Sequence, residues 1–288
     1  MRFGLSPRRR SDCDEIVTGS FYVGGMADAL ADFDRRPMTF STMSYDVYVA
    51  GTGPAVVVLP EIPGITPEVA DFGRRVVEAG FTVWIASLFG TPGKEFSEGY
   101  AMRTLVSQCV RKEFLAFARS KGAPVTNWMR ELVTHAHAES GGAGVGVVGM
   151  CFTGNFALAL AVDPAVKVPV MSQPALPFAI SRGHRADLHV TPDDLAAVKQ
   201  RTVDDDLCVI GLRFTGDPMV PGARFERLRS EFGDAFLGVE IDSSKGNPHG
   251  FGIRSHSVLT AEYDPDPEHP AHQAHQLVLD HFRQKLLV

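Results

Sequence analysis

Short apolar runs alternate with longer amphipathic segments along most of the chain. The runs at 55–59, 81–86 and 145–148 are almost entirely apolar, which is typical of strands buried on both faces of a parallel sheet. Between the first two lies Thr66-Pro67-Glu68, a capping threonine followed by proline and an acid, which is typical of a helix start. The order strand, helix, strand predicts a βαβ unit with a right-handed crossover.

The same patterns continue to the end of the chain. Further strands are expected at 166–171, 208–214 and 236–241, and helices at about 102–119, 124–139, from Thr191-Pro192 onward, 222–232 and 272–287. The stretch 40–49 alternates loosely, so it and the run at 55–59 are predicted to form an antiparallel edge that leads into the parallel core. Residues 1–38 are charged and weakly periodic. We therefore expect an N-terminal extension over 1–38 and one α/β domain over 39–288, with helices on both faces of a mostly parallel sheet.

The most informative turn is Gly149-Met150-Cys151-Phe152-Thr153, between the apolar run at 145–148 and the apolar, alanine-rich segment that follows. A reactive residue two places after a glycine, between strand and helix, is typical of a nucleophile elbow. Cys151 at a helix N-terminus would be favoured as a thiolate, and the backbone N–H of Phe152 could stabilise an oxyanion. The alternative is a buried core thiol in a tight turn.

Composition narrows the class of protein. The formal net charge is -6, which disfavours nucleic acid and anionic membranes as partners, and no apolar run is long enough for a membrane span. The four cysteines have no paired metal spacing and are too few for a disulfide scaffold, so a reducing, cytoplasmic location is expected. The basic run Arg8-Arg9-Arg10 is followed by acidic and polar residues instead of an apolar core, so no signal peptide is predicted.

Two further candidate groups follow predicted strands. Asp217 comes after the run at 208–214, and His249 comes after the run at 236–241. The order nucleophile, acid, histidine is the order of α/β-hydrolases. His249 would take the proton of Cys151, and Asp217 would hold the imidazole tautomer. Each residue alone is also typical of an ordinary turn or surface loop.

These motifs resemble the dienelactone hydrolase family over roughly 40–287. The resemblance rests on four stretches: Leu59-Pro60-Glu61-Ile62-Pro63-Gly64, Gly149-Met150-Cys151-Phe152-Thr153-Gly154, Gly216-Asp217-Pro218-Met219-Val220-Pro221 and His249-Gly250-Phe251. It implies an α/β-hydrolase fold with Cys151, Asp217 and His249 as the triad. It also implies that Glu61 contacts the resting nucleophile and aids its activation. The backbone N–H groups of Ile62 and Phe152 would form the oxyanion hole.

The chain departs from the family pattern at three positions. The family's elbow usually has glycine where Thr153 stands. Members that act on dienelactone hold its carboxylate with two arginines, and the corresponding places are near Thr91 and Ile253, with Lys94 and Arg254 close but shifted in sequence. We therefore expect a neutral or differently shaped substrate. The predicted pocket contains Phe89, Thr91, Phe251 and Ile253.

The sequence thus predicts a hydrolase that cleaves a small-molecule ester or lactone through an acyl-cysteine, without metal or cofactor, as a monomer or small homo-oligomer. Two alternatives stay open: a broad carboxylesterase or thioesterase of the same fold, and a non-catalytic binding protein that kept the fold. A metal site is disfavoured, because the C-terminal histidines do not form one stripe on a helix; these are His269, His272, His275 and His281.

Overall fold

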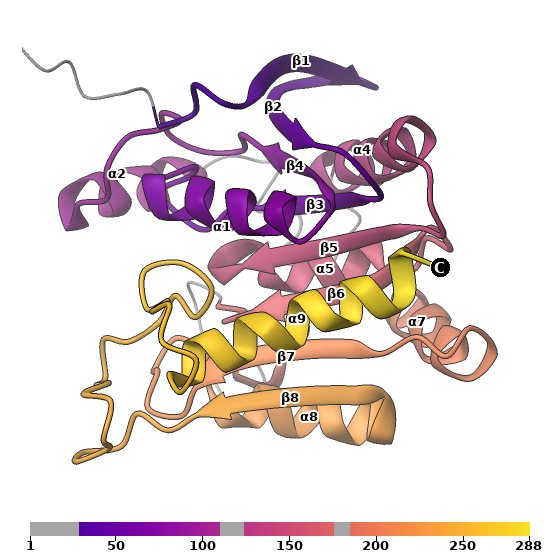
Figure 1. Ribbon diagram of the computed structural model, residues 1–288. Coiled ribbons are helices and arrows are strands. Elements are labelled where there is room, and N and C mark those ends of the chain that lie inside the picture. The colour runs from indigo at the N-terminus through magenta and orange to yellow at the C-terminus, as the bar shows by residue number, and fades with distance from the viewer. Residues whose placement is uncertain (1–28, 110–123, 176–184) are drawn as a thin grey trace, which may run out of the picture.

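An eight-stranded sheet with helices on both faces forms the fold (Figure 1). The computed structural model describes residues 29–109, 124–175 and 185–288. The strand order is β1-β2-β4-β3-β5-β6-β7-β8, and within it β2 alone runs antiparallel to its neighbours. The strands are β1 (Asp34–Phe40), β2 (Met43–Gly51), β3 (Ala55–Leu59), β4 (Thr82–Ala86), β5 (Val145–Met150), β6 (Val166–Ser172), β7 (Val209–Phe214) and β8 (Phe236–Ile241).

The described helices divide between the two faces of the sheet. One apolar layer packs under α1 (Pro67–Glu78) and α9 (Pro270–Leu286). The other packs under α4 (Pro124–Ser140), α5 (Gly154–Leu160), α7 (Pro192–Asp204) and α8 (Gly222–Phe232). The helix α2 (Glu98–Cys109) lies beyond the carboxyl ends of the parallel strands (Figure 1). The α/β class and the mostly parallel sheet predicted from the sequence are confirmed.

Local signals account for where the helices begin. Thr66 Oγ1 accepts a hydrogen bond from Val69 N at the start of α1, and Thr191 Oγ1 accepts one from Asp194 N at the start of α7. Each threonine is followed by proline at the first helical position, as expected. Both helix starts therefore follow from capping chemistry.

The edge of the sheet differs from the prediction. We expected 40–49 to pair with 55–59, but β2 pairs with β1 on one side and with β4 on the other. The crossover through α1 places β4 beside β3, on the side away from β5. This leaves β4 as the only neighbour that β2 can reach on the core side. Residues 34–38, which we had placed in the extension, belong to β1; residues 1–28 lie outside the described part.

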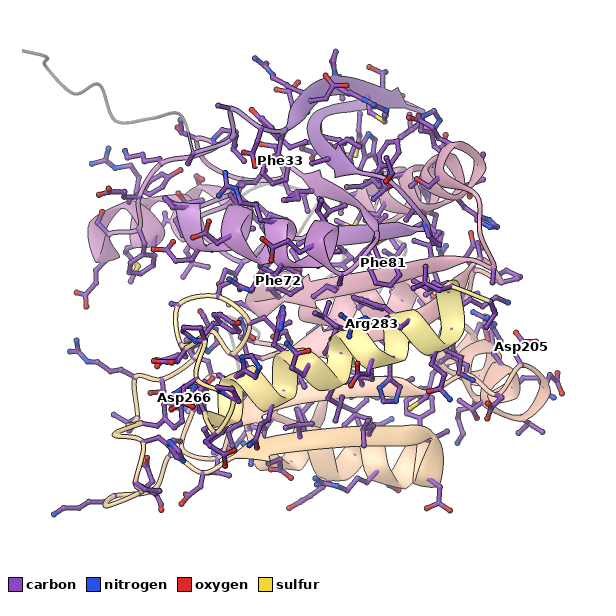
Figure 2. The ribbon with its side chains drawn as sticks, viewed as in Figure 1. Phe33, Phe72, Phe81, Asp205, Asp266 and Arg283 are labelled. Carbon is purple, nitrogen blue, oxygen red and sulfur yellow. The ribbon has the colours of Figure 1, made fainter. Side chains whose placement is uncertain are left out.

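Aromatic side chains fill the layer between α1, α9 and the sheet (Figure 2). Phe81 packs edge-on against Phe282 with ring centroids 5.8 Å apart, and Phe72 packs edge-on against His275 at 5.8 Å.

No described helix is long and apolar enough to cross a bilayer.

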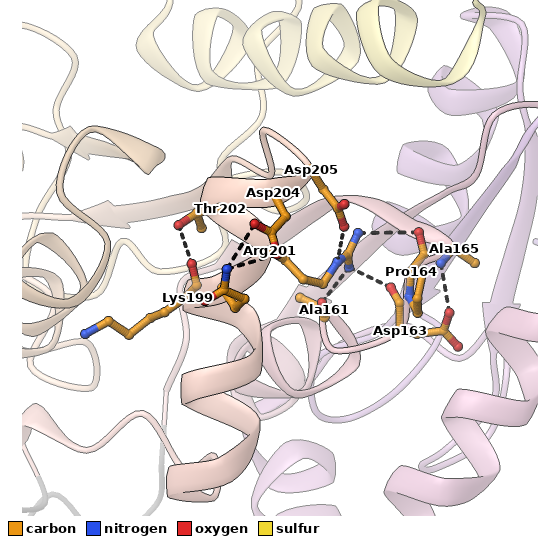
Figure 3. A network of polar contacts seen from close by, with 10 residues as sticks. Ala161, Asp163, Pro164, Ala165, Lys199, Arg201, Thr202, Asp204 and Asp205 are labelled. Carbon is orange, nitrogen blue, oxygen red and sulfur yellow. Dashed lines mark hydrogen bonds and ion pairs between the residues drawn. The ribbon is translucent and has the colours of Figure 1, made fainter.

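Arg201 holds the end of the helix that starts at the predicted nucleophile elbow (Figure 3). Its Nη1 donates to the carbonyls of Ala161 and Asp163, each at 2.6 Å, just after α5. Its Nε donates to Asp205 Oδ2 at 2.7 Å. The guanidinium is buried and is the side-chain donor to both carbonyls, of which that of Asp163 also accepts from Val166 N at 3.0 Å.

We expect Arg201→Met to lower the free energy of unfolding by about 3 kcal/mol, because the buried carbonyl of Ala161 and the half-buried carbonyl of Asp163 both lose a charged donor. Urea denaturation measures this change. The matched control is Lys199→Met on the same helix, which removes an exposed ion pair with Glu231 and should cost at most about 1 kcal/mol. Equal effects of the two variants would contradict the anchoring role.

His275 should make stability depend on acid. Burial, with a smaller contribution from the nearby Arg75 charge, lowers the pKa of His275 to about 3. Neither ring nitrogen has a hydrogen-bond partner among the described residues. The unfolded chain takes up this proton near pH 6.5, whereas the folded chain stays neutral to about pH 3, so acid favours unfolding over that window. This residue should contribute a loss of about 1.4 kcal/mol per pH unit there. His275→Phe should remove that part of the slope in urea denaturations at pH 6.5, 5.5 and 4.5; an unchanged slope would refute it.

Candidate functional site

Cys151 lies at a strained turn directly after β5. Its φ is 52°, a left-handed value that is uncommon outside glycine, and a short 3₁₀ turn, Cys151–Thr153, leads into α5. A Cβ on Gly149 would lie 2.4 Å from the carbonyl oxygen of Thr153, so the position before the turn requires glycine. The local geometry is that of a strand–turn–helix nucleophile elbow.

Thr153 ties this elbow to the end of β3. Its side chain is fully buried, and Oγ1 donates to the carbonyl of Leu59 at 2.6 Å while it accepts from Met150 N at 2.9 Å. The carbonyl of Pro60 lies 3.3 Å from the same hydroxyl. A glycine cannot make these bonds. The departure from the family pattern therefore has a structural role.

Asp217 follows β7 and is buried. Its Oδ1 accepts from Met219 N at 2.9 Å, which holds the turn, and its Oδ2 accepts from Nδ1 of His256 at 2.6 Å. The preceding Gly216 N donates to Ser243 Oγ at 2.8 Å. The carboxylate is thus fixed from its own loop and presents one oxygen to a histidine.

His256 is the histidine that the structure brings to Asp217 and Cys151. Burial lowers the pKa of His256, but negative charge on Cys151 and the hydrogen bond to Asp217 together raise this pKa well above its ordinary value. Nε2 is buried and has no hydrogen bond of ordinary geometry in the described structure. Nε2 therefore has its hydrogen-bonding capacity available for a reacting group in the pocket. Hydrogen bonds between catalytic groups are often long or poorly aligned before substrate binds.

The expectation that His249 takes this place is wrong. His249 is exposed, with its ring centroid 5.6 Å from that of His269. Asn247 accounts for its position, because Asn247 Oδ1 accepts from the backbone N of His249 at 3.1 Å and from that of Phe251 at 3.1 Å. These bonds close the loop on itself, so His249 turns to solvent.

Glu61 fastens the segment after His256 to the end of β3. Its carboxylate is buried and accepts from Ser257 Oγ at 2.6 Å, Thr260 Oγ1 at 2.5 Å and Gln173 Nε2 at 3.2 Å. The resemblance implied a contact with Cys151 instead. None of the hydrogen bonds found for this carboxylate among the described residues involves Cys151, so its visible role is to position the histidine loop.

A pocket of about 690 Å³ opens at Cys151 and His256. Ile62 and Phe152, the expected oxyanion-hole residues, both line it. The further lining residues lie on the loop after β3, around α2, after β6 and β7, and on the histidine loop: Glu61, Pro63, Thr66, Glu68, Phe96, Glu98, Ala101, Met102, Leu105, Ala175, Met219, Arg254, Ser257, Thr260, Ala261 and Glu262.

The four residues predicted for the pocket lie outside its lining. Phe89 is one layer behind, edge-on to the ring of Phe152 at 5.9 Å. The backbone N–H of Thr91 donates to the hydroxyl of Tyr100 at 2.5 Å, so this donor is already paired within the protein. Phe251 packs against Phe214 at 4.8 Å, and Ile253 is exposed on the surface. Phe251 and Ile253 were assigned to the pocket because they follow His249 in the chain. Since His249 is not the catalytic histidine, this reason no longer applies to them.

Carboxylates outnumber cations in the described lining. Glu68, Glu98 and Glu262 join the buried Glu61, and the one guanidinium, on Arg254, lies 3.4 Å from Glu98 Oε1. Lys94 is not in the lining, because its Nζ stacks 4.3 Å over the ring of Tyr100. Family members that act on dienelactone hold its carboxylate with two arginines. The described pocket of this chain contains no unpaired lysine or arginine in their place.

The C-terminal histidines do not converge. His272 lies beside Tyr263, His281 Nδ1 lies 2.8 Å from the carbonyl of Leu277, and His275 is buried on the side of α9 that packs against Phe72. Over the ranges that the structure describes, no group of three or more possible metal ligands occurs.

Sequence reasoning missed His256, Ser257 and Thr260. Their local sequence has no glycine or aromatic signal like that of His249-Gly250-Phe251. It also missed the part that α2 plays. A helix was predicted from about 102, but nothing in its pattern indicates which face covers a pocket.

We expect Thr153→Val to lower the free energy of unfolding by about 2–4 kcal/mol, because two buried hydrogen bonds are lost at unchanged shape. Thr153→Ser keeps the hydroxyl and loses a methyl, which costs about 1 kcal/mol. Urea denaturation of both variants measures the difference. A valine variant as stable as the serine variant would show that the hydroxyl does not hold the elbow.

The model of the dienelactone hydrolase family matches residues 45–286. No curated protein matches the chain. Similar solved structures include the dienelactone hydrolase-like promiscuous phosphotriesterase P91 from metagenomic libraries, with TM-score 0.56 and 17% identity over 88% of this chain and 99% of that one.

Two more solved structures share the fold. A dienelactone hydrolase from Anabaena variabilis has TM-score 0.55 and 15% identity, over 88% of this chain and 99% of that one. A thioesterase domain from the curacin biosynthetic pathway has TM-score 0.52 and 11% identity, over 86% and 99%. At these identities the likeness shows the α/β-hydrolase fold. With the family match over most of its length, the chain belongs to the dienelactone hydrolase family, a family of hydrolases that act on ester bonds.

Proposed function

We propose that this protein hydrolyses an ester or lactone by acyl transfer to Cys151, with His256 as general acid and base and Asp217 as the carboxylate that orients it. One observation carries the proposal. His256 Nδ1 donates to Asp217 Oδ2 at 2.6 Å, while its Nε2 is buried in the pocket that Cys151 also lines and makes no hydrogen bond of ordinary geometry among the described residues. This is the arrangement that a triad needs.

The first half-reaction forms the acyl-cysteine. The Cys151 thiol gives its proton to His256, and the sulfur attacks the substrate carbonyl carbon, whose oxygen takes up negative charge. The backbone N–H groups of Ile62 and Phe152 would hold this oxygen, since both residues line the pocket beside the elbow. His256 then gives its proton to the leaving oxygen as the carbon–oxygen bond breaks. In a lactone, that oxygen stays attached to the acyl group.

The second half-reaction restores the enzyme. His256, now neutral, takes a proton from water while the water oxygen attacks the thioester carbon. The tetrahedral species collapses with loss of the sulfur, which leaves a carboxylic acid product and Cys151. Asp217 supports both steps because its charge stabilises the imidazolium that forms between them.

Glu61 acts in this scheme as a positioning residue. Its three hydrogen bonds reach Ser257 and Thr260 on the histidine loop and Gln173 after β6. A buried carboxylate needs such donors, so the loop and the strand end are held together. This keeps His256 in place between Cys151 and Asp217.

The charges of the pocket support an uncharged substrate. Glu68, Glu98 and Glu262 line the pocket, and Arg254 is exposed and paired with Glu98. A substrate carboxylate that enters here loses water and meets like charges without a bidentate cation. A carboxylesterase acting on neutral esters fits these charges. A thioesterase uses the same chemistry and is the nearest alternative.

A non-catalytic binding protein of the same fold is the alternative from another class. It predicts that ligands bind but esters are not turned over. The expectations of a cytoplasmic location, and of a monomer or small homo-oligomer, stay predictions.

The central test is turnover of p-nitrophenyl acetate. We expect Cys151→Ala to abolish it because the acyl acceptor is lost, and His256→Ala to lower kcat by at least about a hundredfold because the general base is lost. Initial rates at matched protein concentration measure both effects.

Each variant has a control in this chain. Cys208 is the other free cysteine described and lies half-buried before β7, so Cys208→Ala should stay active. His249→Ala should also stay active, since His249 is exposed and outside the pocket lining. Activity that survives Cys151→Ala, or that disappears with His249→Ala but not with His256→Ala, would refute the assignment.

Substrate charge gives an independent prediction. We expect kcat/KM for a neutral lactone to exceed that for dienelactone of similar size by at least about tenfold, because one unmet charged hydrogen bond is worth about 1.5–3 kcal/mol. Steady-state kinetics on both compounds measure the ratio. Preference for dienelactone by an order of magnitude would mean that a cation reaches the pocket after all.

A further inference from the structure

We propose that the catalytic pocket binds an elongated, uncharged acyl chain along the face of α2, so that the substrates are esters of medium-length apolar acids. This inference rests on the proposed function, since it assigns a direction and a chemistry to the acyl group that Cys151 would carry. It starts from the wall of the pocket that faces away from the triad.

One face of α2 forms that wall. Glu98, Ala101, Met102 and Leu105 all line the pocket, and their spacing of three and four residues places them on one side of a helix. Phe96 continues the same lining just before the helix begins. The helix lies at the carboxyl ends of the parallel strands, next to the elbow side of the sheet (Figure 1). The wall is therefore continuous with the site at Cys151.

This wall is apolar although it is exposed. Phe96 is 55% exposed and Met102 is 61% exposed, and Met219, which lines the pocket after β7, is 46% exposed. Large apolar side chains that stand in water next to a catalytic pocket are typical of a ligand-binding surface. Covering them with an acyl chain removes apolar area from water on both partners.

Apart from Glu98, the wall lacks side chains that would hold a polar acyl chain. Phe96, Ala101, Met102 and Leu105 carry no hydrogen-bonding side chain, so a hydroxylated or sugar-like acyl group would lose water without gaining a partner along them. Glu98 lies on the same face of α2, and its negative charge disfavours an acyl chain that ends in a carboxylate. An unsubstituted hydrocarbon chain fits both conditions.

The expected effect follows from the cost of leaving a methylene in water. A buried methylene is worth about 0.8 kcal/mol, so each one added to the acyl chain should raise kcat/KM by up to about fourfold while it still contacts the wall. Between acetate and octanoate the gain should exceed a hundredfold. The flexible Met102 side chain suits chains of differing shape.

The test measures kcat/KM for p-nitrophenyl acetate, butyrate, hexanoate and octanoate, each below its critical micelle concentration. We expect a rise through this series in the wild type. Phe96→Ser and Met102→Ser should each lower the octanoate-to-acetate ratio by at least about fivefold, since each removes apolar wall.

Val106→Ser is the matched control. Val106 lies on the same helix and is 58% exposed, but it does not line the pocket. Its replacement should leave the octanoate-to-acetate ratio unchanged. A ratio near one in the wild type, or an equal fall in the Val106 and Met102 variants, would overturn the proposal.

The outcome can be separated from that of the catalytic proposal. If acetate turnover depends on Cys151 but does not rise with chain length, then only the α2 wall is refuted. If acetate turnover survives Cys151→Ala, the acyl-cysteine itself is refuted, and the chain-length series then describes another site.

Discussion

The left-handed backbone at Cys151 is the constraint on which the site depends. A non-glycine residue in this conformation costs of order 1–3 kcal/mol, so its surroundings must hold it there. Gly149 lets the turn close, and the Thr153 hydroxyl bonds the turn to the end of β3. Because β5 lies in the middle of the sheet, the strain is placed where packing on both faces is most complete. The reactive side chain is thereby held out of the sheet and into the pocket.

Two buried carboxylates then bring the remaining groups to this point. Asp217 holds the ring of His256, and Glu61 holds Ser257 and Thr260 just after it. Both carboxylates come from strand ends at the same edge of the sheet, where ligand sites of open α/β sheets lie. A long loop is thus fixed at two adjacent places by groups on rigid elements. Asp217 and Glu61 thus fix the histidine and its loop through buried polar contacts that are made in the folded state.

The sheet and the capped helices could be predicted because buried strands and Thr-Pro helix starts leave local signals. Which strand pairs with β2 could not, since it depends on the crossover through α1. Cys151 and Asp217 follow strands directly, so their positions could be located from the chain alone. His256 could not, because it lies far along a loop whose path depends on Asn247 and Glu61. The sequence shows Thr153 only as a departure from the usual glycine of the elbow. Its structural role follows from the hydrogen bond of its hydroxyl to the carbonyl of Leu59, which the sequence does not reveal.

The long connection that carries His256, residues 242–269, has a consequence for how such sites diverge. The entropy of closing a flexible loop grows only with the logarithm of its length, so doubling a loop costs about 0.6 kcal/mol. Insertions and deletions in the loop before the histidine should therefore change the free energy of folding little, provided that Ser257 and Thr260 keep their hydrogen bonds to Glu61. The number of residues between the catalytic acid and the histidine can then vary while the position of the imidazole is retained. In relatives, the histidine is better found by the hydroxyl residues that follow it and reach a buried glutamate than by its distance from the last strand.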